Sequence, residues 1–248
     1  MKDLRQIALS VAPLWRVPKA GTRERELLFG EGFIVLEDDG VVAFGQSEKD
    51  GYSGYLASAS LRDPVEITHT VSAWATHLYS APDIKSPELA SLSFGSRIRI
   101  VSATGRFSET YDGAYLPTNH TRPVDSVMTD TVAVAELFLG TPYLWGGNSC
   151  YGMDCSGLVQ AALLACGKDC PADTDQQERQ VGQTLGHNEP VKRGDLLFWQ
   201  GHVAIAVDSE TIIHANANDM AVAYEGIDHA IGRIADKGEG PVTARKRP

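Results

Sequence analysis

The sequence predicts two small antiparallel β-barrels followed by a larger α+β domain, at residues 1–66, 67–122 and 123–248. Three observations lead to this prediction. The N-terminal half contains an internal repeat of short apolar runs. The C-terminal half opens with helical patterns, one of which begins at a cysteine, and then changes to short β-rich segments that carry two histidines.

The internal repeat consists of matching pairs of segments that occur in the same order along the chain. The pairs are LWRVP (14–18) with LYSAP (78–82), LLFGEGFIVL (27–36) with LSFGSRIRIV (92–101), and YSGYL (52–56) with YDGAYL (111–116). Gly, Pro and Asp turns separate the apolar runs in each copy, which is typical of a small antiparallel barrel. A duplicated spacer or binding module without chemistry would show the same pattern.

Helices are expected after a linker near Pro123. The first lies within residues 126–139, where Val127, Val134, Leu137 and Phe138 fall near helical spacing before Gly140 and Pro142 end the helix. The second follows a tight glycine loop, begins at about Cys155 and ends at Gly167. Its apolar face consists of Leu158, Val159, Ala162, Leu163 and Cys166.

Short β-rich segments complete the third domain. They are DLLFW (195–199), HVAIAV (202–207) and TIIHA (211–215), with turns at Gly201 and at Asp208–Ser209. His202 begins the second segment and His214 lies in the third. If these segments are neighbouring strands, the two imidazoles lie side by side.

Composition and charge disfavour several classes of partner. The hydrophobic and charged fractions are those of a globular protein, and the net charge of -10 disfavours nucleic acid or an anionic membrane surface. No apolar run is long enough for a membrane span or a signal peptide, so we expect a cytoplasmic protein, unless export is unusual or the start is trimmed. Four cysteines are too few for a disulfide scaffold, and without C-x2-C pairs they do not favour zinc. We expect no cofactor.

Cys155 is the candidate nucleophile. A thiol at a helix N-terminus is stabilised as the thiolate, and a neighbouring imidazole can take and return its proton. Cys155, His202 and His214 therefore suit the roles of nucleophile, general base and orienting group. Each of these residues alone is usually a packed side chain, but chance seldom produces all three together. If the hypothesis holds, Cys155 has a depressed pKa and is alkylated faster than Cys150, Cys166 or Cys170.

The motifs from residue 127 onward resemble those of the NlpC-type (NlpC/P60) family of papain-like cysteine peptidases, which cut bacterial cell-wall peptides. In chain order they are TPYLWGG, DCSGL, GDLLFW, GHVAIAV and IIHA. The resemblance implies a papain-like α+β domain with a helix packed on an antiparallel sheet. The repeats resemble bacterial SH3-like domains. The whole arrangement is similar to the γ-D-glutamyl-L-diamino acid endopeptidases, which act on murein peptides with a free N-terminal L-alanine.

The resemblance assigns catalytic roles position by position. Cys155 matches the nucleophile, His202 the general base and His214 the orienting residue. Tyr143 matches a tyrosine whose hydroxyl helps to bind the oxyanion. One departure is Cys150, where the family usually has a proline or a small residue. Further matches to residues that line the substrate groove are Trp145, Asp154 and Ser156.

The resemblance also implies a clamp for the amine of the substrate. In the subgroup that acts on free L-alanine ends, an acid after the nucleophile helix holds this amine, and PADTDQQ supplies Asp173, with Thr174 where a serine is commoner. An acid and a tyrosine of the first barrel close the groove in that subgroup, and Glu31 and Tyr52 fit those positions. The alternatives are a helix N-cap for Asp173 and two surface residues of a repeat for the barrel pair.

These observations leave functions of different classes. The first is a cysteine endopeptidase that cuts the γ-D-Glu to L-diamino acid bond of short murein peptides, in peptide recycling or turnover. The second is a cell-wall peptide-binding module with weak catalysis, and the third is an amidase or acyltransferase of the same fold. The complete set of Cys155, His202 and His214 favours the peptidase. Its partner would be a murein peptide, without nucleic acid, membrane or cofactor.

Overall fold

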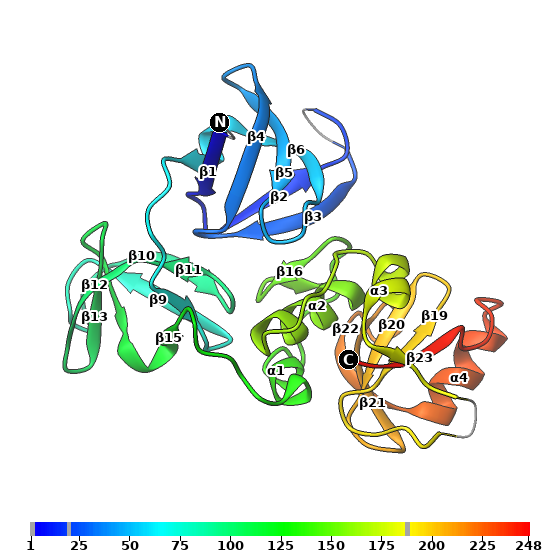
Figure 1. Ribbon diagram of the computed structural model, residues 1–248. Helices are drawn as coiled ribbons and strands as arrows, with labels where there is room; N and C mark the ends of the chain where they lie inside the picture. The colour runs from blue at the N-terminus through cyan, green and yellow to red at the C-terminus, as the bar shows by residue number, and fades with distance from the viewer. Residues whose placement is uncertain (1–2, 19–20, 187–188) are drawn as a thin grey trace. The chain divides into compact units, whose positions relative to one another are not determined.

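The computed structural model describes residues 3–18, 21–186 and 189–248, and this part of the chain is strand-rich with four α-helices (Figure 1). The chain separates into two compact units. Met1–Ser126 and Asn148–Cys150 form the first unit, and Val127–Gly147 and Tyr151–Pro248 form the second. Both copies of the sequence repeat thus belong to the first unit, and both histidines of interest belong to the second.

The first copy of the repeat forms one antiparallel sheet in the order β3-β2-β6-β5-β4-β1-β7. Its strands are β1 (Asp3–Ile7), β2 (Val11–Trp15), β3 (Arg23–Leu28), β4 (Gly32–Asp38), β5 (Val42–Ser47), β6 (Ser53–Ala57) and β7 (Leu61–Arg62). A Cβ at Gly54, in the YSGYL motif, would come within 2.6 Å of the Leu14 side chain, so glycine lets β6 pass close to the core. The core consists of Ile7, Ala12, Leu14, Leu27, Phe33, Ala43 and Leu56.

The second copy forms two sheets, in the orders β10-β9-β14-β13-β12 and β11-β8-β15. The strands are β8 (His69–Val71), β9 (Ala75–Tyr79), β10 (Glu88–Ser93), β11 (Arg97–Ile98), β12 (Ile100–Thr104), β13 (Phe107–Thr110), β14 (Tyr115–Pro117) and β15 (Thr121–Pro123). The two sheets separate at Arg99, which lies between β11 and β12. Strand β11, before Arg99, pairs with β8, and strand β12, after it, pairs with β13. The two copies therefore differ in strand pairing, and the core of the second is Val71, Leu78, Leu92, Ile98, Ala114 and Leu116.

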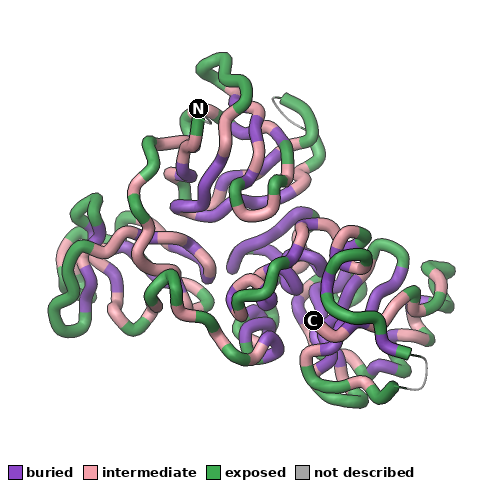
Figure 2. Tube along the Cα trace, viewed as in Figure 1, coloured by how far each residue is buried: buried purple, intermediate pink, exposed green. Residues whose placement is uncertain are grey.

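The second unit is built on a sheet in the order β18-β23-β19-β20-β21-β22. Its strands are β18 (Gln183–Thr184), β19 (Leu196–Trp199), β20 (His202–Ala206), β21 (Thr211–Asn216), β22 (Ala221–Gly226) and β23 (Ala244–Arg247). Almost every residue of β19, β20 and β21 is buried (Figure 2). The three β-rich segments predicted from the sequence are thus the central strands. Two further short strands are β16 (Asn148–Ser149), which belongs to the first unit, and β17 (Gly152–Met153), which belongs to the second.

The helices of the second unit are α1 (Thr131–Glu136), α2 (Cys155–Ala165), α3 (Thr174–Gln180) and α4 (Ile227–Asp236). Helix α2 contacts α1 and strands β20 and β21. Helix α4 packs Ile227, Ala230 and Ile234 onto one face of the sheet. The sheet residues in that cluster are Leu197, Trp199, Ala204, Ala206 and Ile212. In the part of the chain that the structure describes, no helix is both long and apolar enough to span a membrane.

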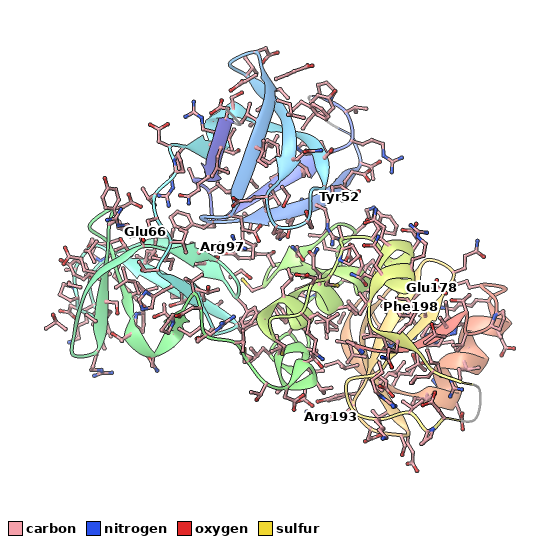
Figure 3. The ribbon with its side chains drawn as sticks, viewed as in Figure 1. Tyr52, Glu66, Arg97, Glu178, Arg193 and Phe198 are labelled. Carbon is pink, nitrogen blue, oxygen red and sulfur yellow. The ribbon has the colours of Figure 1, made fainter. Side chains whose placement is uncertain are left out.

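Helix α1 is shorter than the sequence predicted. Asp130 caps it, and its carboxylate accepts hydrogen bonds from the backbone N–H groups of Val132 and Ala133. The guanidinium of Arg193, labelled in Figure 3, lies 2.8 Å from the same carboxylate. Val127, which the apolar spacing placed on the helix, precedes it and is 60% exposed. The capping aspartate therefore sets the start of α1, and the apolar spacing does not.

Candidate active site

Asp154 positions Cys155 at the first residue of helix α2. Its Oδ1 accepts a hydrogen bond from the Gly157 backbone N–H at 2.6 Å, which caps the helix. Its Oδ2 accepts one from the Gly146 N–H at 3.0 Å, and the Ser156 hydroxyl donates to Oδ1 at 3.2 Å. Asp154 and Ser156, which the resemblance assigned to the groove, are both buried. Their visible contacts hold the helix start and the preceding glycine loop in place.

The Cys155 thiol lies beside the start of strand β20. Its Sγ is 3.8 Å from the Thr174 hydroxyl and 4.0 Å from the Gly201 carbonyl oxygen. Gly201 directly precedes His202, the first residue of β20, and α2 contacts this strand. The fold thus brings the thiol, from the helix, to the end of the strand that carries His202.

His202 and His214 lie on neighbouring strands and are joined by a hydrogen bond. His202 Nε2 is 2.9 Å from His214 Nδ1, and the strands β20 and β21 pair antiparallel. This confirms that the two imidazoles lie side by side, as the strand pattern predicted. The contact occupies His202 Nε2, so Nδ1 is the ring nitrogen that remains for a proton from the thiol.

Glu225 lies behind His214, and the sequence did not single it out. His214 Nε2 is 3.1 Å from Glu225 Oε2. The Arg233 guanidinium donates two hydrogen bonds to the carboxylate, each of 2.8 Å, and His229 Nδ1 is 2.7 Å from Oε1. Because His214 pairs with Ala223, two residues before Glu225, the imidazole and the carboxylate share one face of the sheet. Side chains alternate between the two faces along the AVAYEG strand, and this alternation could have predicted from the sequence that Glu225 lies on the face of His214.

The substrate-free thiol and imidazole are both neutral at pH 7. Burial and the Asp154 carboxylate raise the pKa of Cys155 to about 11, and burial with His214 lowers the pKa of His202 to about 3. The proton therefore stays on sulfur. The depressed thiol pKa predicted from the helix N-terminus is wrong for this state, because desolvation of a buried thiolate outweighs the helix dipole and the hydrogen bond from Thr174.

We expect the alkylation of Cys155 to accelerate with pH. Only the thiolate reacts, so below the raised pKa the iodoacetamide rate should increase about tenfold per unit between about pH 7 and 10. Mass spectrometry of the labelled protein gives the rate at each pH, and Cys155→Ala identifies the site. A rate that is constant over this range would contradict the neutral pair and indicate a preformed thiolate and imidazolium.

Tyr143 is a half-buried phenol near the thiol. Burial raises its pKa, and the charges of Cys155 and Asp154 raise it further, so the hydroxyl keeps its proton. Its backbone N–H donates to the Met220 carbonyl at 2.8 Å, and an isolated bridge joins it to Met153. A phenol that stays protonated is a hydrogen-bond donor, which is what a developing oxyanion requires. Trp145, two residues on, is 62% exposed.

Asp173 stands at the N-cap position of helix α3, but its carboxylate makes no capping hydrogen bond. The alternative placed Asp173 at the helix N-cap, and Asp173 occupies that position without a side-chain capping hydrogen bond. Gln177, which the sequence did not single out, is fully buried and donates from Nε2 to the Ser156 carbonyl at 2.9 Å and to the Pro171 carbonyl at 3.0 Å. This amide ties the start of α2 to the segment that leads into α3. Asp173 is thus held at a defined place relative to the nucleophile helix.

Glu31 and Tyr52 belong to the first unit, where each has partners. Glu31 is 5% exposed, lies 2.7 Å from Lys49 Nζ and accepts a hydrogen bond from the Leu28 N–H at 2.9 Å. The hydroxyl of Tyr52, labelled in Figure 3, donates to Glu24 at 3.2 Å. Glu31 is therefore no surface residue of the repeat. Its contacts with Lys49 and Leu28 lie within the first unit.

Two family descriptions match the chain. Residues 140–232 match the NlpC/P60 family, and residues 14–61 match the bacterial dipeptidyl-peptidase Sh3 domain. The first stretch contains Cys155, His202 and His214. Among the described residues, no group of three or more His, Cys, Asp or Glu side chains could hold a metal ion.

The chain is similar to named peptidases, and to a solved structure, over most of its length. It is 30% identical over 215 residues to a γ-D-glutamyl-L-lysine dipeptidyl-peptidase of Bacillus subtilis (strain 168). The aligned region covers 77% of this chain and 72% of that protein. A protein of the same name from Bacillus cereus (strain ATCC 10987 / NRS 248) is 26% identical over 243 residues, covering 84% and 72%. The crystal structure of an NlpC/P60 family protein from Bacillus cereus ATCC 10987 matches with a TM-score of 0.83 at 20% identity, over 99% of both chains, and shares the fold.

Proposed function

Since the chain belongs to the NlpC/P60 family of peptidases, we propose that it is a cysteine endopeptidase that cuts the γ-D-Glu to L-diamino acid bond of short cell-wall peptides with a free N-terminal L-alanine. The observation that carries the proposal is a buried thiol at a helix start, next to the first residue of β20, where His202 is hydrogen-bonded to His214 of the neighbouring strand. The names of the relatives, γ-D-glutamyl-L-lysine dipeptidyl-peptidases, support the choice of bond.

The site suggests a sequence of proton transfers. Cys155 Sγ attacks the carbonyl carbon of the γ-amide while its proton passes to His202 Nδ1. The oxyanion accepts hydrogen bonds from the Tyr143 hydroxyl and the Cys155 backbone N–H. His202 then protonates the departing amine, which leaves a thioester. Water, deprotonated by His202, hydrolyses the thioester and returns the thiol.

Because the resting pair is neutral, proton transfer accompanies the attack. His214 would hold the His202 ring in place through the 2.9 Å hydrogen bond and stabilise the imidazolium that forms. The base therefore carries a positive charge only in the transition state and the intermediates. A buried site strengthens every charge interaction that this step creates.

Recognition of the substrate amine is the second part of the proposal. Asp173 would bind the ammonium group of L-alanine, because Gln177 ties the segment that leads into α3 to the start of the nucleophile helix. Glu31 and Tyr52 would close the groove, with Glu31 also serving the first unit through Lys49. An enzyme that requires a free amine selects short peptides over longer chains, which suits the recycling or turnover of wall fragments, in the cytoplasm if the peptides are imported.

Replacing His214 by alanine should lower kcat more than it raises KM. The residue acts on a charge that appears in the transition state, so ground-state binding should change little. We expect kcat to fall by about 10- to 100-fold, with KM within about threefold of the unaltered enzyme. Initial rates over a range of tripeptide concentrations measure both constants, and an unchanged kcat would remove His214 from the mechanism.

Defined peptides test the proposed reaction. L-Ala-γ-D-Glu-L-Lys, the same peptide with meso-diaminopimelate, and intact sacculi are incubated with the enzyme, and the products are identified by mass spectrometry. The expected product is the dipeptide L-Ala-D-Glu from at least one tripeptide, with little release from sacculi. Cleavage at another amide, or release from sacculi at a rate equal to that of tripeptides, would overturn the proposal.

A further inference from the structure

We propose that Glu225 is a positioning residue that sets the proton positions in the His202–His214 pair, so that His202 Nδ1 is available to take the thiol proton. The assignment deepens the proposed peptidase function and rests on it for its catalytic meaning. It rests structurally on a chain of contacts from β20 through β21 to β22: His202 Nε2 to His214 Nδ1 at 2.9 Å, and His214 Nε2 to Glu225 Oε2 at 3.1 Å.

The direction of the hydrogen bond between the imidazoles follows from the carboxylate. A neutral imidazole has one N–H and one lone pair, so only one ring of the pair can donate across the contact. With its proton on Nε2, His214 faces Glu225 with an N–H, and its Nδ1 accepts from His202 Nε2–H. His202 Nδ1 then keeps the lone pair that a general base needs.

The opposite direction is unfavourable. His214 would carry its proton on Nδ1 and present the Nε2 lone pair to a carboxylate, two acceptors in contact in a fully buried site. His202 would then be protonated on Nδ1 and could not accept the thiol proton. The 3.1 Å contact between Nε2 and Oε2 falls outside hydrogen-bond geometry, and His214 Nε2 has no hydrogen-bond partner among the described residues. Glu225 is therefore the group that can bias the tautomer.

Helix α4 holds the Glu225 carboxylate in its ionised form. Arg233 donates to both carboxylate oxygens, and these hydrogen bonds lower the pKa of Glu225 to about 2. The helix can do this because it covers the sheet face that includes Ile212, which is also the face of His214. A carboxylate clamped from the opposite side by a bidentate guanidinium has little freedom to turn away from His214.

The charged groups around the pair act in opposite directions. The charges of Glu225, on β22, and Asp219, in the β21–β22 turn, raise the pKa of His214, and Arg233 on α4 lowers it. Burial, His214 and Arg233 lower the pKa of His202, and the Glu225 charge raises it. His229, also on α4, contacts Glu225 but is 73% exposed at its side chain. Removing Arg233 should therefore raise the pKa of His214, and removing the Glu225 charge should lower it.

The test is nitrogen NMR of the histidines combined with kinetics. In protein labelled with ¹⁵N-histidine, long-range ¹H–¹⁵N spectra near neutral pH should show both His202 and His214 as Nε2–H tautomers. Glu225→Gln keeps the shape and removes the charge. It should change the tautomer of the pair and lower kcat by about 10- to 100-fold, with KM within about threefold. Glu225→Asp should recover part of kcat.

Two further variants separate positioning from folding. His229→Ala removes an exposed contact to the same carboxylate and should keep the spectra and kcat of the unaltered enzyme. Arg233→Met should move the acid limb of kcat/KM to higher pH, because it removes a charge that lowers the histidine pKa values, and Glu225→Gln should not. Melting temperatures accompany each variant.

An Nδ1–H tautomer of His202 in the unaltered protein, or unchanged tautomers and kcat in Glu225→Gln, would overturn the proposal. The spectra require no substrate. Failure to cut any wall peptide would therefore count against the proposed function and leave the tautomer assignment to be judged on the spectra.

Discussion

Replacing Cys155 by alanine is expected to abolish cleavage of γ-D-glutamyl peptides, with kcat/KM falling by a factor on the order of 10⁴ or more. In the proposed reaction the Cys155 sulfur is the group that forms the acyl intermediate. His202 and Tyr143 have roles only in moving the proton and binding the oxyanion of a reaction that the sulfur begins. The loss should therefore appear with every peptide substrate and should not be recovered at high substrate concentration.

Cys166→Ala provides the matched control for this prediction. Cys166 is the C-cap residue of the same helix, α2. The substitution also removes one thiol sulfur, but at the end of the helix opposite to Cys155. It should retain kcat/KM within about twofold, as expected for a change that leaves the reacting groups in place. Both variants should be compared by the release of L-Ala-D-Glu and by melting temperature. Turnover by Cys155→Ala at a rate near that of Cys166→Ala would exclude Cys155 as the nucleophile.

Acetylation of the substrate amine should cause the second-largest decrease in kcat/KM. An ammonium group that leaves water for a closed groove needs an opposite charge and hydrogen bonds, or its desolvation is uncompensated. If Asp173 supplies that charge, acetylating L-Ala-γ-D-Glu-diaminopimelate should lower kcat/KM by a factor on the order of 10² or more. Asp173→Asn should cost a comparable factor on the free-amine peptide and little further on the acetylated one.

This pattern is a double-mutant cycle between one side chain and one substrate group. Asp175→Asn is the control, because Asp175 lies in the first turn of the same helix, pairs with Arg179 and is largely exposed. It should leave the preference for the free amine unchanged. Equal turnover of free and acetylated peptides would show that the groove is open at that end, as in a general wall hydrolase.

Local sequence patterns predicted the reacting groups well. The apolar spacing after Cys155 and the glycine at 167 bound helix α2 closely. Asp154, directly before Cys155, caps the helix through a hydrogen bond to Gly157, only three residues further along the chain. The histidine pair was also predictable, because strands joined by a short turn are usually neighbours and their residues fall in register. The NlpC/P60 motifs lie on these same local elements.

The two copies of the repeat have matching sequence patterns, which predicted the same kind of barrel for both, but their strands pair differently in the structure. Both are strand-rich, yet the first forms one sheet and the second forms two, which part at Arg99. Strand pairing depends on which edges meet in space, and a run of alternating apolar residues does not specify its neighbours. For α1, a single capping aspartate overrode the apolar spacing on which the longer helix was predicted.

The sequence by itself determined which residues carry the proposed chemistry: Cys155 at a helix start and His202 and His214 on adjacent strands. Only the tertiary structure decided the state of those residues and their support. Glu225 behind His214, Gln177 between two helix starts, and the Lys49 partner of Glu31 are side-chain contacts between separate elements. The raised pKa of Cys155 and the lowered pKa of His202 arise from burial, which is a property of the packed fold. Covalent order fixes which residues are near in the chain, whereas desolvation and long-range contacts exist only once the chain is folded.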